Sequence, residues 1–257
     1  MKKKASMAGL AGMILVLAVF IILIIYFIKA SGTMSGNADR DTCRMSVLAQ
    51  SLGKEIWSTN LVEPECKTYT IRFYNDHVEK NGKAIDVFDA RKKDFVKKFD
   101  ALSEEIIFNV AAEEYRWCWY QFLEGQKSVF DWNAFFPSGK TTCFVCAEIS
   151  FDPDVREGLY SSKDFLTYMQ DTNMQRSNMT YGAYLSQNLE EGAFEKVFSG
   201  FTPSHDKNYY VTFEKIGKNS MAAKKIFGVD VEFLSLSILD SDLMFDFCDV
   251  IKRGSVK

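Results

Sequence analysis

An uninterrupted apolar stretch near the amino terminus limits the fold of this chain more than any other feature. Residues 8–28 carry no charged side chain, and almost all of them are aliphatic. A helix of about 21 residues is long enough to cross the roughly 30 Å hydrocarbon core of a bilayer. The sequence therefore predicts a transmembrane signal-anchor helix over residues 7–29.

Three other interpretations compete with an anchor. A cleaved secretory peptide has an apolar region of about 7–15 residues, shorter than this one, although Ala30-Ser31-Gly32 offers small residues for cleavage. Lys4-Ala5 resembles the processing site of an archaeal pilin-type leader, but Leu10 stands where that family has a glutamate. The third interpretation is a helix buried in a soluble domain.

Charges beside the apolar stretch predict its orientation. Lys2, Lys3 and Lys4 precede it, whereas only Lys29 lies at its far end. Because positive charge is retained in the cytoplasm, the amino terminus is expected inside. The predicted protein is a single-pass cell-membrane protein with a cytoplasmic tail (1–6), an anchor (7–29), a linker (30–40) and an extracytoplasmic domain (41–257).

The composition of the remaining chain indicates a packed, acidic domain. Four of the 31 Lys and Arg residues lie within the first 29 residues, so residues 30–257 carry 27 of them against 34 Asp and Glu, a net charge near −7. An acidic surface without a basic stripe argues against nucleic-acid binding. The expected partners are the membrane, through residues 7–29, and a protein or a second copy of the chain on the cell surface.

All the cysteines follow the predicted anchor. In an oxidising exterior, an even number of cysteines favours disulfide bonds, whereas the same number in the cytosol would favour metal or thiol chemistry. Six cysteines allow 15 pairings, and sequence alone does not choose among them. The disulfide candidates are Cys43, Cys66, Cys118, Cys143, Cys146 and Cys248.

Hydrophobic periodicity predicts the first elements of the domain. Apolar residues three and four apart indicate a helix over 42–57, with Asp41 or Thr42 as its cap. Alternation over 69–74 indicates a strand, and Asn81-Gly82 indicates a tight hairpin turn. A long apolar stripe predicts a helix from about Asp89 to Leu123, which Gly125 ends.

The second half of the chain alternates strands with short helices. Strands are predicted over 141–152, 208–216 and 231–239, and helices over 161–169 and 181–198. Few helices connect consecutive strands directly. The expected fold class is α+β: a disulfide-stabilised, mostly antiparallel sheet packed with helices, after the transmembrane helix.

The spacing of Cys143 and Cys146 decides how this pair is interpreted. Residues three apart on a strand are separated by about 10 Å and point to opposite faces, whereas a disulfide needs Cα atoms within about 7 Å. The two cysteines are therefore expected in separate structural disulfides, with zinc binding and redox catalysis as alternatives. A Cys43–Cys66 bond is expected, with Cys118 bound to Cys143 or Cys146, and the remaining one bound to Cys248 or free.

No motif assigns a catalytic residue. The chain has two histidines, His77 and His205. Ser204-His205-Asp206 contains the residue types of a catalytic triad, but triad members normally converge from distant positions. The sequence lacks a nucleophile elbow, a phosphate loop and a zinc-protease motif. No metal site and no cofactor are predicted.

Three further groups of residues receive structural interpretations. The acidic pairs Glu104-Glu105, Glu113-Glu114 and Glu190-Glu191 are interpreted as solvated helical surface. Trp117-Cys118-Trp119-Tyr120 is interpreted as a core packed around a disulfide, with ligand stacking as the alternative. Asn178-Met179-Thr180 is a glycosylation sequon, so Asn178 is a candidate for modification outside the cell.

Several of these features together resemble a group of small single-span archaeal envelope proteins. They are the lysine-led anchor, Cys43 on a helix, Cys66 before a strand, Cys118-Trp119 with Glu124-Gly125, and Cys143-x-x-Cys146. The similarity runs over most of the first 150 residues. It implies the same topology and cysteine framework, and it implies no activity.

The sequence favours a non-enzymatic, membrane-anchored extracytoplasmic protein that acts by binding or assembly. The alternatives are an extracytoplasmic thiol–disulfide oxidoreductase that uses Cys143 and Cys146, a hydrolase, or a zinc-binding domain.

Overall fold

The structure is a computed structural model that describes residues 38–57, 64–89, 94–125, 140–155, 164–175, 177–187, 197–198, 202–217 and 233–254. The chain forms two compact units, residues 1–41 and 42–257. The predicted tail and anchor, and the linker as far as residue 37, lie outside the described residues. None of the described helices has the length and apolar character needed to span a bilayer.

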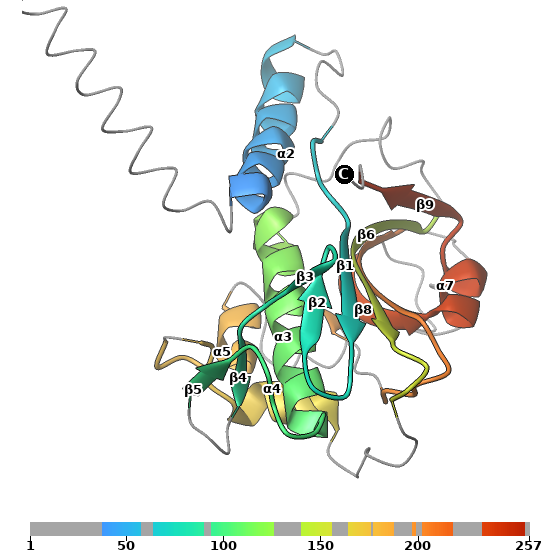
Figure 1. The fold of residues 1–257 in the computed structure, drawn as a ribbon. Coiled ribbons are helices and arrows are strands. Elements are labelled where there is room, and N and C mark those ends of the chain that lie inside the picture. The colour runs from blue at the N-terminus through green and yellow to red at the C-terminus, as the bar shows by residue number, and fades with distance from the viewer. Residues whose placement is uncertain are drawn as a thin grey trace, which may run out of the picture. The chain divides into compact units, whose positions relative to one another are not determined.

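A seven-stranded sheet forms the centre of the larger unit (Figure 1). The strand order is β3-β2-β1-β6-β7-β8, and β9 pairs with β6 on the edge that β1 also uses. The β1–β6 and β6–β9 pairs are parallel and the others are antiparallel, which confirms the predicted α+β class with a mostly antiparallel sheet. The strands are β1 Tyr69–Phe73, β2 Val78–Lys80, β3 Lys83–Ala84, β6 Thr142–Phe151, β7 Tyr209–Ile216, β8 Phe233–Asp240 and β9 Val250–Arg253.

The predicted hairpin turn is confirmed between β2 and β3. Asn81 and Gly82 have φ values of 51° and 71°, the left-handed pair that a two-residue type I′ turn requires. The Asn81 side chain also accepts a hydrogen bond from the Thr70 backbone N–H at 2.9 Å. This bond ties the turn to β1.

Helix α3, Glu104–Gln121, is labelled in Figure 1, and its buried side chains contribute a large part of the main core. Its buried side chains pack with those of β6, β7 and β8. The indole ring of Trp119 lies between Phe198 and Phe213, with ring centroids 5.2 and 6.1 Å away. The core interpretation of the aromatic cluster is therefore confirmed for Trp119, which is fully buried.

The predicted long helix from Asp89 is wrong at Asp89 and over residues 94–103, where the structure describes the chain. Strands β4, Val87–Asp89, and β5, Asp94–Val96, form a small separate sheet there. Phe88 and Phe95 face each other across it, with an edge-to-face contact at 5.5 Å. The helix starts only at Glu104, because the Ser103 side chain caps it by accepting from the Ile106 N–H.

The other helices are shorter than predicted or begin earlier. Helix α2, Ala38–Trp57, starts before the expected cap, with Asp39 and Asp41 in the first turn, where acidic residues are favoured. The end of the predicted linker is therefore helical. The remaining described helices are α4 Phe165–Asp171, α5 Tyr181–Leu185 and α7 Ser241–Phe247.

Gly125 ends the turn η1, Leu123–Gly125, that follows α3. Its φ is +69°, and a Cβ atom there would lie 2.2 Å from the Trp119 ring. We expect Gly125→Ala to lower the free energy of unfolding by about 2–4 kcal/mol, from the left-handed backbone and overpacking together. Urea unfolding of the full chain, followed by tryptophan fluorescence, measures this loss.

Gly82→Ala is a matched control, because Gly82 has a similar φ of +71° but no atom within 4 Å of its Cβ position. It should cost only the backbone contribution, about 1–2 kcal/mol. Equal losses in the two variants would contradict the contact with Trp119.

Candidate functional site

The structure joins all six cysteines in three disulfides. Cys43 bonds to Cys66, as predicted. Cys118 bonds to Cys146 and Cys143 to Cys248, which selects one of the alternatives that the sequence left open. The disulfide framework is therefore confirmed, and the two cysteines of the close pair are not bonded to each other.

Cys143 and Cys146 anchor opposite faces of the sheet. Cys146 lies in the main core beneath α3, whereas Cys143 lies in a second cluster with Met244 and Cys248 of the α7 region. A bulge in β6 between Val145 and Ala147 shifts the register with β7 but leaves the two sulfur atoms on opposite sides. The predicted alternation of the strand is thus sufficient to separate them.

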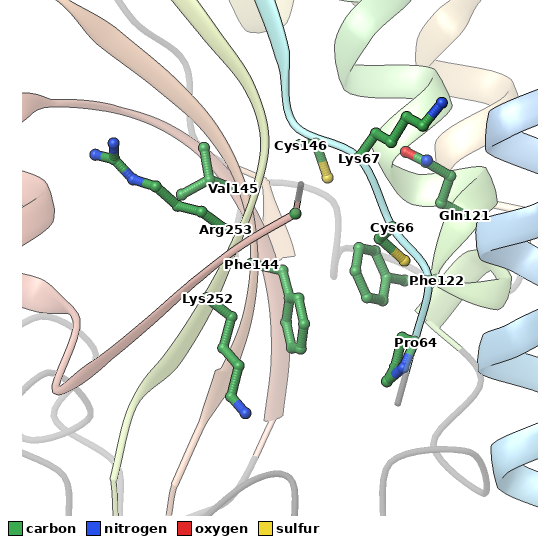
Figure 2. A pocket seen from close by; sticks show the side chains of 11 residues that line it. Pro64, Cys66, Lys67, Gln121, Phe122, Phe144, Val145, Cys146, Lys252 and Arg253 are labelled. Carbon is green, nitrogen blue, oxygen red and sulfur yellow. The ribbon is translucent and has the colours of Figure 1, made fainter. Parts of the chain in front are cut away.

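A small pocket lies where four segments meet beside two of these disulfides (Figure 2). Its volume is about 50 Å³, room for a few water molecules or a group of a few heavy atoms. The lining comes from the segment before β1, the end of α3, the middle of β6 and the end of β9. Cys66 and Cys146, which belong to two different disulfides, are among the residues that line it.

Hydrogen bonds through Thr68 hold these segments together. The Thr68 hydroxyl donates to the Val145 carbonyl at 2.8 Å and accepts from the Gly254 N–H at 3.0 Å. Gly254 approaches so closely that an added Cβ atom would lie 1.8 Å from the Cys66 carbonyl oxygen. Any side chain at position 254, the residue after β9, would therefore force the backbone of one of these two segments to shift.

One polar side chain in the pocket lacks a partner. Gln121 is 2% exposed, and its amide nitrogen has no hydrogen bond within the described part of the chain. The rings of Phe122 and Phe144, 5.0 Å apart, form an apolar wall. Lys67, Lys252 and Arg253 also contribute to the lining, and their charged ends spread outward around the pocket (Figure 2).

The histidines lie elsewhere. His77, beside β2, contacts Asp76 through Nδ1 at 2.6 Å. In Ser204-His205-Asp206, the Ser204 hydroxyl donates to the Asp206 carboxylate, and this bond lowers the pKa of Asp206. Aspartate thus binds the serine directly, which differs from the serine–histidine–aspartate order of a triad.

Two predicted acidic pairs lie on α3. Glu104 is half-buried and Glu105 exposed at its start, as expected for helical surface, but Glu113-Glu114 is not solvated surface, in contrast to the prediction. Glu114 is buried and forms an ion pair with Lys80 at 2.7 Å. Glu113 pairs with Arg116 and accepts a hydrogen bond from the Tyr181 hydroxyl, both at 2.7 Å. These carboxylates attach β2 and α5 to α3. Glu190-Glu191 lies outside the described residues.

One carboxylate on β7 is buried, although no pattern in the sequence predicts its burial. Glu214 is fully buried, and its oxygens accept hydrogen bonds from the Thr212 hydroxyl at 2.7 Å and the Ser237 hydroxyl at 3.0 Å. Burial raises the pKa of Glu214 to about 7, although the hydroxyl groups oppose this shift. Strand alternation places Glu214 and Thr212 on the face of the sheet opposite Phe213. From the sequence alone, this face would be predicted to be exposed to solvent.

The glycosylation sequon lies at the surface of the described structure. Asn178 is exposed between α4 and α5, and Thr180 of the same sequon caps α5 by accepting from the Ala183 N–H at 3.1 Å. Among the described residues, no three His, Cys, Asp or Glu side chains cluster in a way that would hold a metal ion.

Comparisons with known proteins do not identify relatives of this chain. No family model matches it, and neither the curated proteins nor the solved structures contain a match. The resemblance to archaeal envelope proteins therefore stays a prediction from the sequence.

Proposed function

We propose that this protein is a membrane-anchored extracytoplasmic protein that acts by binding or assembly rather than by catalysis. Residues 7–29 would anchor it, and the disulfide-bonded unit would face the exterior and bind a protein partner or a second copy. The observation that carries the proposal is the pairing of all six cysteines in three disulfides. Such bonds form and persist mainly in oxidising compartments.

The side chains that line the pocket favour binding over catalysis. The pocket lining contains cations, an amide and aromatic rings, but neither histidine of the chain. A thiol–disulfide oxidoreductase would need Cys143 and Cys146 to react as a pair, and each is bonded to a different cysteine. We therefore favour the binding function over the oxidoreductase alternative.

Reporter fusions test the proposed topology. Alkaline phosphatase fused to the carboxy terminus should be active in a bacterial host, because it folds only outside the cytoplasm, while green fluorescent protein at the same position should stay dark. Replacing Lys2, Lys3 and Lys4 by glutamate is the matched control and should reduce the phosphatase signal, since these charges hold the amino terminus inside. The reverse reporter pattern in the unmodified chain would refute the proposal.

A thiol count on the same membranes tests the oxidised state. A membrane-impermeant maleimide should label no cysteine of the native chain, and labelling should appear only after unfolding and reduction. Free thiols in freshly isolated protein would contradict the extracytoplasmic assignment.

A further inference from the structure

We propose that Asn178 is an N-glycosylation site that receives an oligosaccharide from a lipid-phosphate carrier outside the cytoplasm. This inference rests on the extracytoplasmic placement in the proposed function, and it adds a covalent modification to it. Asn178-Met179-Thr180 is the one Asn-x-Ser/Thr sequence in the chain, and its middle residue is not proline, which would block modification. Three observations on the folded chain support the proposal: the exposure of Asn178, the base of its turn and the hydroxyl group of Thr180.

Asn178 is exposed in the turn between α4 and α5, which are both labelled in Figure 1. Its neighbours Ser177 and Met179 are exposed as well. The Asn178 side chain makes no hydrogen bond or ion pair with the part of the chain that the structure describes. A bulky glycan on its amide nitrogen would therefore extend into solvent and break none of the described hydrogen bonds.

The base of this turn is attached to the core. Asn173 and Thr180 form an antiparallel bridge across it. Tyr181, the first residue of α5, is buried, and its hydroxyl donates to the Glu113 carboxylate on α3 at 2.7 Å. The exposed asparagine thus lies in a turn whose base is held by the folded domain, and the glycan would be attached away from the core.

The third residue of the sequon supplies the hydroxyl group that the modification requires. Thr180 caps α5, and its Oγ1 atom accepts a hydrogen bond from the Ala183 N–H at 3.1 Å. A hydroxyl group has one proton to donate and two lone pairs that accept. The cap uses a lone pair and not the proton, so helix capping and sequon recognition make different demands on the same side chain. Variants at this position can therefore separate the two roles.

The modification is a group transfer in which this chain is the acceptor and an oligosaccharyltransferase of the cell is the catalyst. The Nδ2 atom of Asn178 attacks the anomeric carbon of the first sugar. A carbon–nitrogen bond forms as the bond between that carbon and the phosphate oxygen breaks. The amide loses one proton, and the lipid phosphate leaves with the electron pair of the broken bond, so no oxidant or reductant is needed.

Translation of the full chain with microsomes that contain lipid-linked oligosaccharide and the transferase tests the proposal. We expect most of the inserted chain to migrate as one slower band, which peptide-N-glycosidase should return to the original mobility. That glycosidase converts the modified asparagine to aspartate, so mass spectrometry should then find aspartate at position 178.

Three variants separate the modification from the structural role of Thr180. Asn178→Gln should abolish the slower band. Thr180→Asp should also abolish it, although aspartate is at least as good a helix cap as threonine. Thr180→Ser keeps both the cap and the hydroxyl group and should retain the band. Persistence of the slower band in either of the first two variants would overturn the proposal.

A control sequon in a flexible extension after Lys257 distinguishes a failed site from a failed topology. This added sequon should be modified in Asn178→Gln, because the proposed function places the carboxy terminus in the lumen. If the added sequon is modified and Asn178 of the original chain is not, the proposal is overturned and the proposed topology stands. If neither is modified, both are overturned.

Discussion

Replacing Cys143 and Cys248 together by alanine should lower the free energy of unfolding by about 4–5 kcal/mol, as expected for a crosslink that closes a loop of roughly 100 residues. The two cysteines are 105 residues apart, the longest separation among the three disulfides. Both are buried, so alanine avoids placing a serine hydroxyl in the second core cluster. Urea unfolding of the full chain under non-reducing conditions measures the difference.

The Cys43–Cys66 bond offers an internal comparison, because its partners are only 23 residues apart. In the chain-entropy model, its removal should cost about 1 kcal/mol less than removal of Cys143–Cys248. The order of the two double variants is therefore diagnostic. A larger loss for Cys43–Cys66 would show that native contacts, and not loop length, determine the contribution of these bonds.

Replacing Glu214 by glutamine should stabilise the protein at neutral pH and have little effect near pH 4. The pKa of Glu214 is about 7 in the folded chain, against 4.5 as its ordinary value. Between these two values the folded state binds a proton that the unfolded state has released, so stability falls as pH rises. Across this window the loss amounts to roughly 3 kcal/mol, at about 1.4 kcal/mol for each unit of pKa.

The measurement is the difference in unfolding free energy between the original chain and Glu214→Gln at several pH values from 4 to 8. This difference should be near zero at the acid end, grow through pH 5 and 6, and level off above pH 7. Thr212→Val is a matched variant, because the Thr212 hydroxyl lowers the pKa of Glu214. Loss of this hydroxyl should raise the pKa of Glu214 further, so the stability difference should level off at a higher pH. A stability difference between the original chain and Glu214→Gln that does not change with pH would contradict the protonation of Glu214.

Most strands of the sheet were predictable from local patterns. The alternation in Tyr69–Phe73 and the Asn81-Gly82 pair identify β1 and the hairpin, because both signals depend only on neighbouring residues. Local spacing also showed that Cys143 and Cys146 must bond elsewhere. The same kind of signal misled at Phe95 and Phe99, where helical spacing coincides with a strand and a loop.

The environments of Glu214 and Gln121 were not predictable, because both arise from tertiary contacts. Glu214 is buried because the second face of the sheet is also covered, in part by α7 through the Cys143–Cys248 bond. Gln121 lies in a pocket whose walls come from positions 64 to 254. No local pattern brings such distant segments together.

The three crosslinks also determine how the oxidised chain would respond to a pulling force. Between the chain ends, the covalent path crosses from residue 43 to 66, follows the backbone to 118, crosses to 146, steps back to 143 and crosses to 248. Apart from the two terminal segments, before residue 43 and after residue 248, only the backbone between 66 and 118 and the short step on β6 can lengthen along this path. Under tension, the chain segments inside the loops that the disulfides close therefore cannot extend until a sulfur–sulfur bond is reduced.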